Sequence, residues 1–321
     1  MYQYLEAAMN NTFALKKWNM KMSPGNHAKG IWAKKVTLFL MTSVLVMIVL
    51  AGSAWARLDM GIEAYQEGKY KEAMDIFIPL AILDDSKAKH YLELIFDKGV
   101  QGFGKGDYET ALLIFSKLGR YGKKEAETYL GRMIEKGVDA YDKGRYGESL
   151  SLFTHFAANG DARSQFYMGL MCENGHGVGQ NLFEAAGWYK RAAEKGHIEA
   201  QFRMGDMVRF GRGVKKNEEM ALSLFKLADS QGHNGAAVAI GEMYEQGMGV
   251  QKNDAVAYMM YKKASDRGAW DGDYHLGMLY QKGIGVKSDE EIAAVFFRKA
   301  EEKKSKEKQI LKNRENVRDK R

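Results

Sequence analysis

The residues of this chain that could do chemistry are few, and they do not form a known catalytic pattern. Glycine-rich stretches such as residues 175–179 could suggest a phosphate loop, but no G-K-[ST] follows and the stretch recurs, so we interpret it as a structural turn. None of the seven histidines belongs to an H-E-x-x-H motif or a close pair. The single cysteine, Cys172, excludes an intramolecular disulfide and a multi-cysteine zinc site. We expect no catalytic residue, no metal and no cofactor.

The elements that would position any such residues are helices. The chain of 321 residues holds only two prolines, and proline breaks helix interiors. The net charge of +7 describes the two ends more than the body. Six lysines and one acid lie in residues 1–35, and residues 303–321 are again rich in Lys and Arg. We expect both segments to be basic, solvated tails, with contact to anionic lipid as the alternative.

Residues 36–56 form an apolar segment without a charged residue. Its end, Ala54-Trp55-Ala56, has the A-x-A pattern that a signal peptidase accepts, which predicts cleavage after Ala56. The alternative is a retained anchor, because about 21 uncharged residues can span a bilayer. Both interpretations place everything after Arg57 outside the cytoplasm, since the flanking lysines stay inside. We expect an exported protein, in a bacterial periplasm or in the inner membrane facing it.

Glycines in residues 161–302 recur with a period of 36 residues. Six columns keep this step through four copies, which identifies four repeats. The columns are Gly169, Gly205, Gly241 and Gly277; Gly175, Gly211, Gly247 and Gly283; Gly177, Gly213, Gly249 and Gly285; Val178, Val214, Val250 and Val286; Ala185, Ala221, Ala257 and Ala293; and Ala192, Ala228, Ala264 and Ala300. In residues 57–160 the period is 38, and three units carry a glycine, a tyrosine and a phenylalanine at Gly68, Tyr70, Phe77; Gly106, Tyr108, Phe115; and Gly144, Tyr146, Phe153.

Each 36-residue unit predicts two helices joined by a tight loop. In residues 161–197 a first helix ends at Gly175 and Gly177, which can adopt positive φ. Asn181 then has the type of an N-cap, with Glu184 placed to complete a capping box. Glycine inside the first helix needs a reason, because it costs about 1 kcal/mol relative to alanine. We expect it to admit a large residue of the second helix, at Trp188, Leu224, Met260 and Phe296.

These residues resemble the Sel1-like (Sel-one-like) repeat, a relative of the tetratricopeptide repeat. The pattern is G-x-x-x-x-x-G-x-G-V-x-x-[ND] followed by A-x-x-x-aromatic-x-x-A-x-x-x-G, and Gly169 to Gly196 match it throughout. The last unit has Lys304 in place of its final glycine, as a capping repeat would. The three upstream units are more similar to the tetratricopeptide subtype. The resemblance implies an all-α fold, a right-handed α-solenoid of about seven helix-turn-helix repeats, that serves as a protein-interaction scaffold.

A solenoid presents a concave wall lined by the first helix of each pair. Positions on one face of that helix vary between copies while their neighbours stay constant, which predicts a partner-binding stripe. Its candidate residues are Arg163, Tyr167, Leu170, Glu199, Arg203, Asp206, Phe210, Glu242, Gln246, Asp271, His275 and Met278. Mixed charge on this stripe favours a protein partner over nucleic acid, which would need a basic stripe. His197 and His233 follow Gly196 and Gly232 and are expected to be turn residues.

Three functions therefore stand beside one another. The first is a non-enzymatic scaffold or adaptor that acts outside the cytoplasm and binds a partner on its concave face. The second is a membrane-tethered regulator of an envelope enzyme or complex. The third is a cell-wall hydrolase, which would need a cluster of titratable residues that the spacing does not show.

Overall fold

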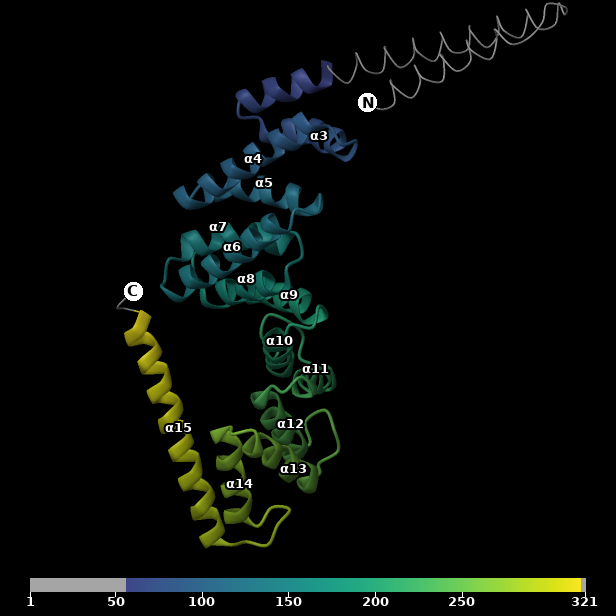
Figure 1. The fold of residues 1–321 in the computed structure, drawn as a ribbon. Helices are drawn as coiled ribbons and strands as arrows, with labels where there is room; N and C mark the ends of the chain where they lie inside the picture. The colour runs from purple at the N-terminus through teal and green to yellow at the C-terminus, as the bar shows by residue number, and fades with distance from the viewer. Residues whose placement is uncertain (1–55, 319–321) are drawn as a thin grey trace, which may run out of the picture. The chain divides into compact units, whose positions relative to one another are not determined.

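The computed structural model describes residues 56–318, and within this range every regular element is a helix (Figure 1). The predicted basic leader and residues 36–55 of the apolar segment lie outside the described residues. Between residues 56 and 318, no helix has the length and apolar character needed to cross a membrane. The described residues divide into two compact units, one that ends at residue 126 and one that begins at residue 127. Consecutive helices pack in pairs within each unit, which is the architecture of an α-solenoid.

The described part of the first unit holds helix pairs of the 38-residue type. A helix at residues 56–66 is followed by α3 (Tyr70–Ile82), α4 (Ser86–Lys105) and α5 (Tyr108–Arg120). The sequence sets these limits locally. Asp85 and Asp107 are N-caps, whose side chains accept hydrogen bonds from Ala88 and Thr110. Gly106, with φ of 83°, ends α4 in the left-handed conformation.

The second unit begins within α6 (Lys124–Asp142) and contains α7 (Tyr146–Ala158) and the four 36-residue pairs. The first helices of these pairs are α8 (Ala162–Asn174), α10 (Ile198–Phe210), α12 (Asn234–Gln246) and α14 (Trp270–Lys282). The second helices are α9 (Leu182–Glu194), α11 (Glu218–Ser230), α13 (Asp254–Asp266) and α15 (Glu290–Arg318). Because Lys304 replaces the terminating glycine, α15 continues through residues expected to form a tail. Lys303 anchors this extension by donating to the Ser265 carbonyl at 3.0 Å.

The loop within each pair follows the predicted glycine pattern. Gly175 and Gly177 have φ of 72° and 74°, and the Gly175 N–H donates to the Met171 carbonyl to close α8. Asn181 caps α9, because its side chain accepts from the N–H groups of Phe183 and Glu184, both at 3.1 Å. The predicted capping box is wrong in one half. The Asn181 N–H donates to the Cys172 carbonyl at 2.8 Å, so it is not available to Glu184.

The glycine inside each first helix makes room for an aromatic ring of the second helix. A Cβ added at Gly205 would lie 2.6 Å from Phe225, and one added at Gly241 would lie 2.5 Å from the ring of Tyr261. The prediction of a close contact is confirmed, but the expected neighbours were wrong by one residue. The same contact occurs in all seven pairs: Gly61–Phe77, Gly99–Phe115, Gly137–Phe153, Gly169–Tyr189, Gly205–Phe225, Gly241–Tyr261 and Gly277–Phe297.

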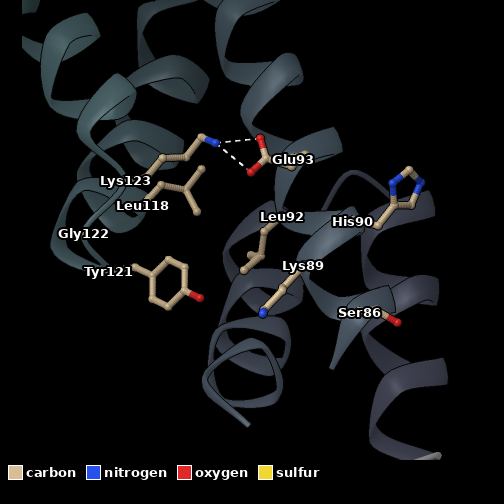
Figure 2. A pocket seen from close by; sticks show the side chains of 9 residues that line it. All are labelled: Ser86, Lys89, His90, Leu92, Glu93, Leu118, Tyr121, Gly122 and Lys123. Carbon is tan, nitrogen blue, oxygen red and sulfur yellow. Dashed lines mark hydrogen bonds and ion pairs between the residues drawn. The ribbon is translucent and has the colours of Figure 1, made fainter. Parts of the chain in front are cut away.

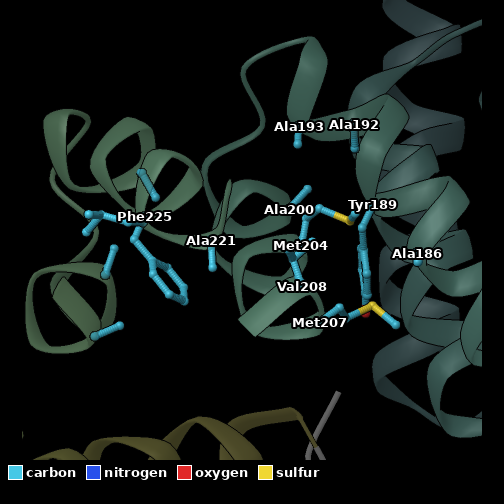
Figure 3. Packing of buried hydrophobic residues seen from close by; sticks show 14 of the residues in the cluster. Ala186, Tyr189, Ala192, Ala193, Ala200, Met204, Met207, Val208, Ala221 and Phe225 are labelled. Carbon is cyan, nitrogen blue, oxygen red and sulfur yellow. The ribbon is translucent and has the colours of Figure 1, made fainter. Parts of the chain in front are cut away.

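The core of the second unit forms around these rings. Tyr189 and Phe225 are fully buried, and Figure 3 shows Met204 and Met207 of α10 reaching toward Tyr189 of α9. Alanines such as Ala192 line the same layer and let the helices approach closely. Burial of each large side chain is worth about 1.5–3 kcal/mol, so the stack of rings supplies much of the stability.

The second glycine of each loop couples one repeat to the one before it. A Cβ at Gly213 would lie 2.2 Å from the carbonyl oxygen of Leu182, at the start of the preceding second helix. A Cβ at Gly249 would lie 2.6 Å from the carbonyl carbon of Glu218, at the equivalent place one repeat later. Only glycine permits this approach together with positive φ. The loop therefore holds successive pairs in a fixed register.

Candidate partner-binding surface

The predicted stripe residues lie on the first helices of the second unit, and we call this surface the first-helix wall. It comprises four positions of each of α8, α10, α12 and α14: Arg163, Tyr167, Leu170 and Asn174; Glu199, Arg203, Asp206 and Phe210; Gly235, Ala239, Glu242 and Gln246; and Asp271, His275, Met278 and Lys282. Part of this set packs inside the protein. The Tyr167 ring stacks on Phe153 at 4.8 Å, and the His275 ring stacks on Tyr261 at 4.5 Å.

Polar side chains join α10 to α12 across the wall. Arg203 donates to Glu199 within α10 at 2.9 Å, and the other oxygen of Glu199 lies 2.9 Å from His233 Nε2, at the start of α12. The hydrogen bond from His233 is the main reason that the pKa of Glu199 falls to about 2, and Arg203 adds to it. Further along α10, Arg209 Nη1 donates to Glu242 of α12 at 2.7 Å. These side chains hold the helices together and are less available to a partner.

His197 and His233 are helix N-caps, which agrees with their prediction as turn residues. The Nδ1 atom of His197 accepts from the Ala200 N–H at 3.2 Å, and that of His233 accepts from the Ala236 N–H at 3.0 Å. A nitrogen that accepts a hydrogen bond carries no proton, so the cap requires the neutral imidazole with its proton on Nε2. Burial lowers the pKa of His197, which further favours its neutral form.

Few side chains in the described part of the chain have the surroundings of a reactive group. Over residues 56–318, no three His, Cys, Asp or Glu side chains are placed to hold a metal ion. Cys172 is buried, and burial raises the pKa of its thiol, which disfavours the thiolate form. The Tyr189 hydroxyl donates to Glu173 at 2.6 Å, and burial raises the pKa of this tyrosine far above its usual range. This hydrogen bond joins α9 to α8.

Four exposed residues form a row at the C-terminal ends of the first helices: Asn174, Phe210, Gln246 and Lys282. Phe210 is 58% exposed, and the guanidinium groups of Arg209 and Arg212 lie 5.0 Å and 6.0 Å from its ring. One turn earlier, Asp206 is half-buried and accepts no hydrogen bond from the described residues. Burial raises the pKa of its carboxyl group, against the opposing effect of three nearby arginines. This region is a part of the wall that remains available.

Two residues that shape the wall, Arg209 and His233, were missed by the sequence prediction. Arg209 is nearly buried and lies off the predicted stripe, but its ion pair with Glu242 fixes a stripe residue. A signal for it exists, because its column reads Glu173, Arg209, Glu245 and Gln281 and is positive only in this copy. Nothing in the spacing marks the pair between His233 and Glu199.

The first unit contains a groove as well. It has a volume of about 600 Å³ and lies between the start of α4 and the turn that follows α5. Figure 2 shows Lys123 reaching Glu93, to whose oxygens it donates at 2.7 Å and 2.6 Å. Lys89 also has a partner, because it pairs with Asp84. With its lysines paired, the groove offers less to a partner than the open part of the wall.

Repeated helix pairs with glycine-seated rings and a wall of varied side chains define a helix-pair repeat protein of the α-solenoid class. Within that class, the last four helix pairs of the chain are Sel1 repeats. The sequence model of the Sel1 repeat matches residues 162–197, 198–233, 235–268 and 270–305. The three upstream pairs lie outside these matches, and their tetratricopeptide-like character stays a prediction. Among curated proteins, no sequence matches this chain.

Solved structures agree with this family. The crystal structure of a Sel1 repeat protein from Oxalobacter formigenes is similar with a TM-score of 0.52 and 27% identity, over 65% of this chain and 85% of that one. The structure of c5321, a protective antigen of uropathogenic Escherichia coli with an SLR fold, has a TM-score of 0.50 and 23% identity. That match covers 81% of this chain and 56% of the antigen, and it shows the fold alone. Sel1 repeat proteins are protein-interaction scaffolds, typically without enzymatic activity.

Proposed function

We propose that this protein is a non-enzymatic scaffold that binds a partner protein on the first-helix wall of its second unit. The observation that carries the proposal is the exposed row with Asn174, Phe210, Gln246 and Lys282. It differs in every copy, whereas the glycine inside each first helix (Gly169, Gly205, Gly241 and Gly277) stays constant. Packing does not require such variety. A surface that recognises one particular partner presents a different side chain at each contact, as this row does.

The partner we propose is a peptide segment or a folded protein, and no cofactor is involved. The wall carries arginines and carboxylates in close alternation, most of them already paired. Nucleic acid would need a continuous basic stripe, which this wall does not offer. Interfaces of moderate polarity with an aromatic anchor are common between proteins, and Phe210 supplies such an anchor.

Location outside the cytoplasm is a further part of the proposal. Its support is the charge-free segment of residues 36–56 with lysines before it, which fits a cleaved signal or a retained anchor. Edman sequencing of the mature protein distinguishes the two, because a start at Arg57 means cleavage after Ala56. Protease added to intact spheroplasts should digest the repeat units in either case. Full protection of the repeats would refute the location.

The binding surface can be tested by photo-crosslinking in living cells. A photoreactive amino acid at Phe210 or Gln246 probes the wall, and the same amino acid at Phe183 or Leu227 probes exposed positions of the second helices. We expect one partner to crosslink from the wall positions and not from the second-helix positions. Crosslinks that form equally from both faces, or only from the second helices, would show that the wall is not the binding surface.

A further inference from the structure

Asp206 is a half-buried carboxylate whose surroundings leave it without a hydrogen-bond donor among the described residues. Two arginines on its own helix are close but are used elsewhere. Arg203 donates to Glu199 at 2.9 Å, and Arg209 donates to Glu242 at 2.7 Å. Arg212, in the loop after α10, lies 4.0 Å from Glu173. Removing a carboxylate partly from water without giving it a hydrogen-bond donor costs free energy. A ligand that donates a hydrogen bond to this carboxylate recovers part of that free energy on binding.

The charges around Asp206 point to a positive ligand. The arginines at 203, 209 and 212 face Glu199, Glu242 and Glu173 as ion pairs, and Asp206 is the one carboxylate left over. The cluster therefore holds three arginines and four carboxylates, and a cation beside Asp206 would balance the one negative charge in excess. At the equivalent position the other repeats carry Leu170, Glu242 and Met278, which are apolar or already paired. The feature is specific to this repeat.

An apolar contact lies one helical turn away. Phe210 follows Asp206 by four residues, so the two side chains emerge on the same face of α10. The ring is held between Arg209 and Arg212 rather than buried in the core. In the neighbouring repeats the same row carries two exposed amides. Asn174 uses its amino group to donate to the Leu170 carbonyl, which leaves its Oδ1 as an acceptor, and Gln246 is exposed.

We propose that Asp206 and Phe210 form a subsite for an extended peptide segment with a basic residue next to an apolar residue. The lysine or arginine of that segment donates to the Asp206 carboxylate, and the apolar side chain packs on the Phe210 ring. Asn174 and Gln246 hydrogen-bond the peptide backbone on either side. This inference rests on the proposed function, because it names the chemistry that the first-helix wall recognises.

Peptide display tests the subsite directly. Random twelve-residue peptides are selected on the immobilised full chain, and the most enriched sequence is made with a fluorescent label for anisotropy. We expect a Lys or Arg beside a Leu, Ile, Met or Phe in the enriched set. Binding of the labelled peptide should weaken at least tenfold with Asp206→Asn and with Phe210→Ala. The matched control Leu227→Ala, on a second helix, should bind as the parent does.

The charge assignment needs a cycle on both molecules. With the parent protein, the glutamine peptide should bind as weakly as the original peptide binds to Asp206→Asn. With Asp206→Asn, the glutamine peptide should bind little more weakly than the original peptide. Helical content and thermal midpoint of Asp206→Asn must match the parent, and Asp206→Glu, which keeps the charge, should retain most of the binding.

Several outcomes would overturn the subsite. Enriched peptides without a basic residue, or no enrichment at all, would refute the basic-apolar ligand. Binding that Phe210→Ala abolishes and Asp206→Asn leaves intact would refute the role of Asp206 while keeping the wall as the binding surface. Binding that neither variant affects would refute this subsite, and crosslinks absent from the wall would refute the proposed function separately.

Discussion

Replacing Gly205 by alanine tests the claim that these glycines seat aromatic rings. The new Cβ would lie 2.6 Å from Cε1 of Phe225, whereas ordinary contact is at 3.4–4 Å. Phe225 is fully buried, so its ring has no empty space to enter and the helices must separate. Alanine favours the helix itself by about 1 kcal/mol, so the two effects have opposite signs.

The size of the steric effect decides the result. Forcing an extra carbon into a close-packed core costs about 1–3 kcal/mol, and the separation of 2.6 Å places this site at the upper end. After subtraction of the helix gain, we expect Gly205→Ala to lower the free energy of unfolding by about 2 kcal/mol. Gly187 supplies the matched control. It lies inside α9, and an added Cβ there meets nothing within 4 Å, so Gly187→Ala should stabilise the protein by about 0.5–1 kcal/mol.

The assay is urea unfolding followed by circular dichroism, with a third variant to identify the cause. Phe225→Leu removes the ring and destabilises the protein alone, but it opens the space that the new methyl group needs. The double variant of Gly205→Ala and Phe225→Leu should therefore be more stable than the sum of the two single effects predicts, by about 1 kcal/mol or more. A stabilising Gly205→Ala, or strict additivity in the cycle, would refute the seating argument.

The remaining predictions concern turns, caps and a buried hydrogen bond. Asp84 has φ of 69° where the later turns between pairs use glycine, so Asp84→Gly should raise the thermal midpoint by about 3 °C, although the exposed pair with Lys89 is lost; an unchanged or lower midpoint would argue against backbone strain. Burial lowers the pKa of His197 below its usual 6.5, so the unfolded chain binds its proton more readily and stability should fall as the pH drops below about 6.5. His197→Asn keeps an N-cap that does not titrate, so the denaturation midpoint should change less between pH 7.5 and 5.5 than in the parent. This range lies above the pH values, from 4.5 to about 2, over which the contribution of Glu199 to stability is lost. An unchanged pH dependence would contradict this reasoning. Tyr189→Phe removes the hydrogen bond to Glu173 and should cost about 1.5 kcal/mol in urea unfolding, and a neutral result would mean that this bond contributes no net stability.

The repeat period predicted the helix pairs because each pair needs the same turns and the same close contacts. The glycines at 175 and 177 and the cap at Asn181 act through their own backbone, and such local effects can be recognised without coordinates. The half of the capping box that failed depends on a carbonyl nine residues earlier, that of Cys172, which the loop brings back to Asn181. A local sequence pattern does not show that the loop brings Asn181 next to the Cys172 carbonyl.

The ring opposite each glycine was assigned one residue too early for a related reason. Trp188 and Tyr189 are adjacent large residues, and a turn of about 100° separates them on the helix. Spacing alone does not show which of them faces the preceding helix. A comparison of the copies does, because the column of Tyr189 is aromatic in all four repeats, whereas the column of Trp188 also contains Leu224 and Met260.

The stripe on the first-helix wall was predicted from variation, which does not distinguish a free side chain from a paired one. Arg203 and Glu242 vary between copies, and both are held in ion pairs. Long charged side chains reach partners on other helices, and their pairing depends on rotamers that spacing leaves open. Asp206 and Phe210 vary between copies in the same way as Arg203 and Glu242. Only the packed structure shows that Asp206 and Phe210 are available to a partner.

In these repeats, the type of the buried aromatic ring goes together with the charge of the residue sixteen positions earlier on the first helix. Tyr189 and Tyr261 donate to Glu173 and Glu245, sixteen residues earlier in each case. Where the ring is Phe225, it has no hydroxyl, and the earlier residue is Arg209, which turns to Glu242 on the next helix instead. The loss of one hydroxyl in the core thus frees a position for the arginine that borders Asp206 and flanks Phe210.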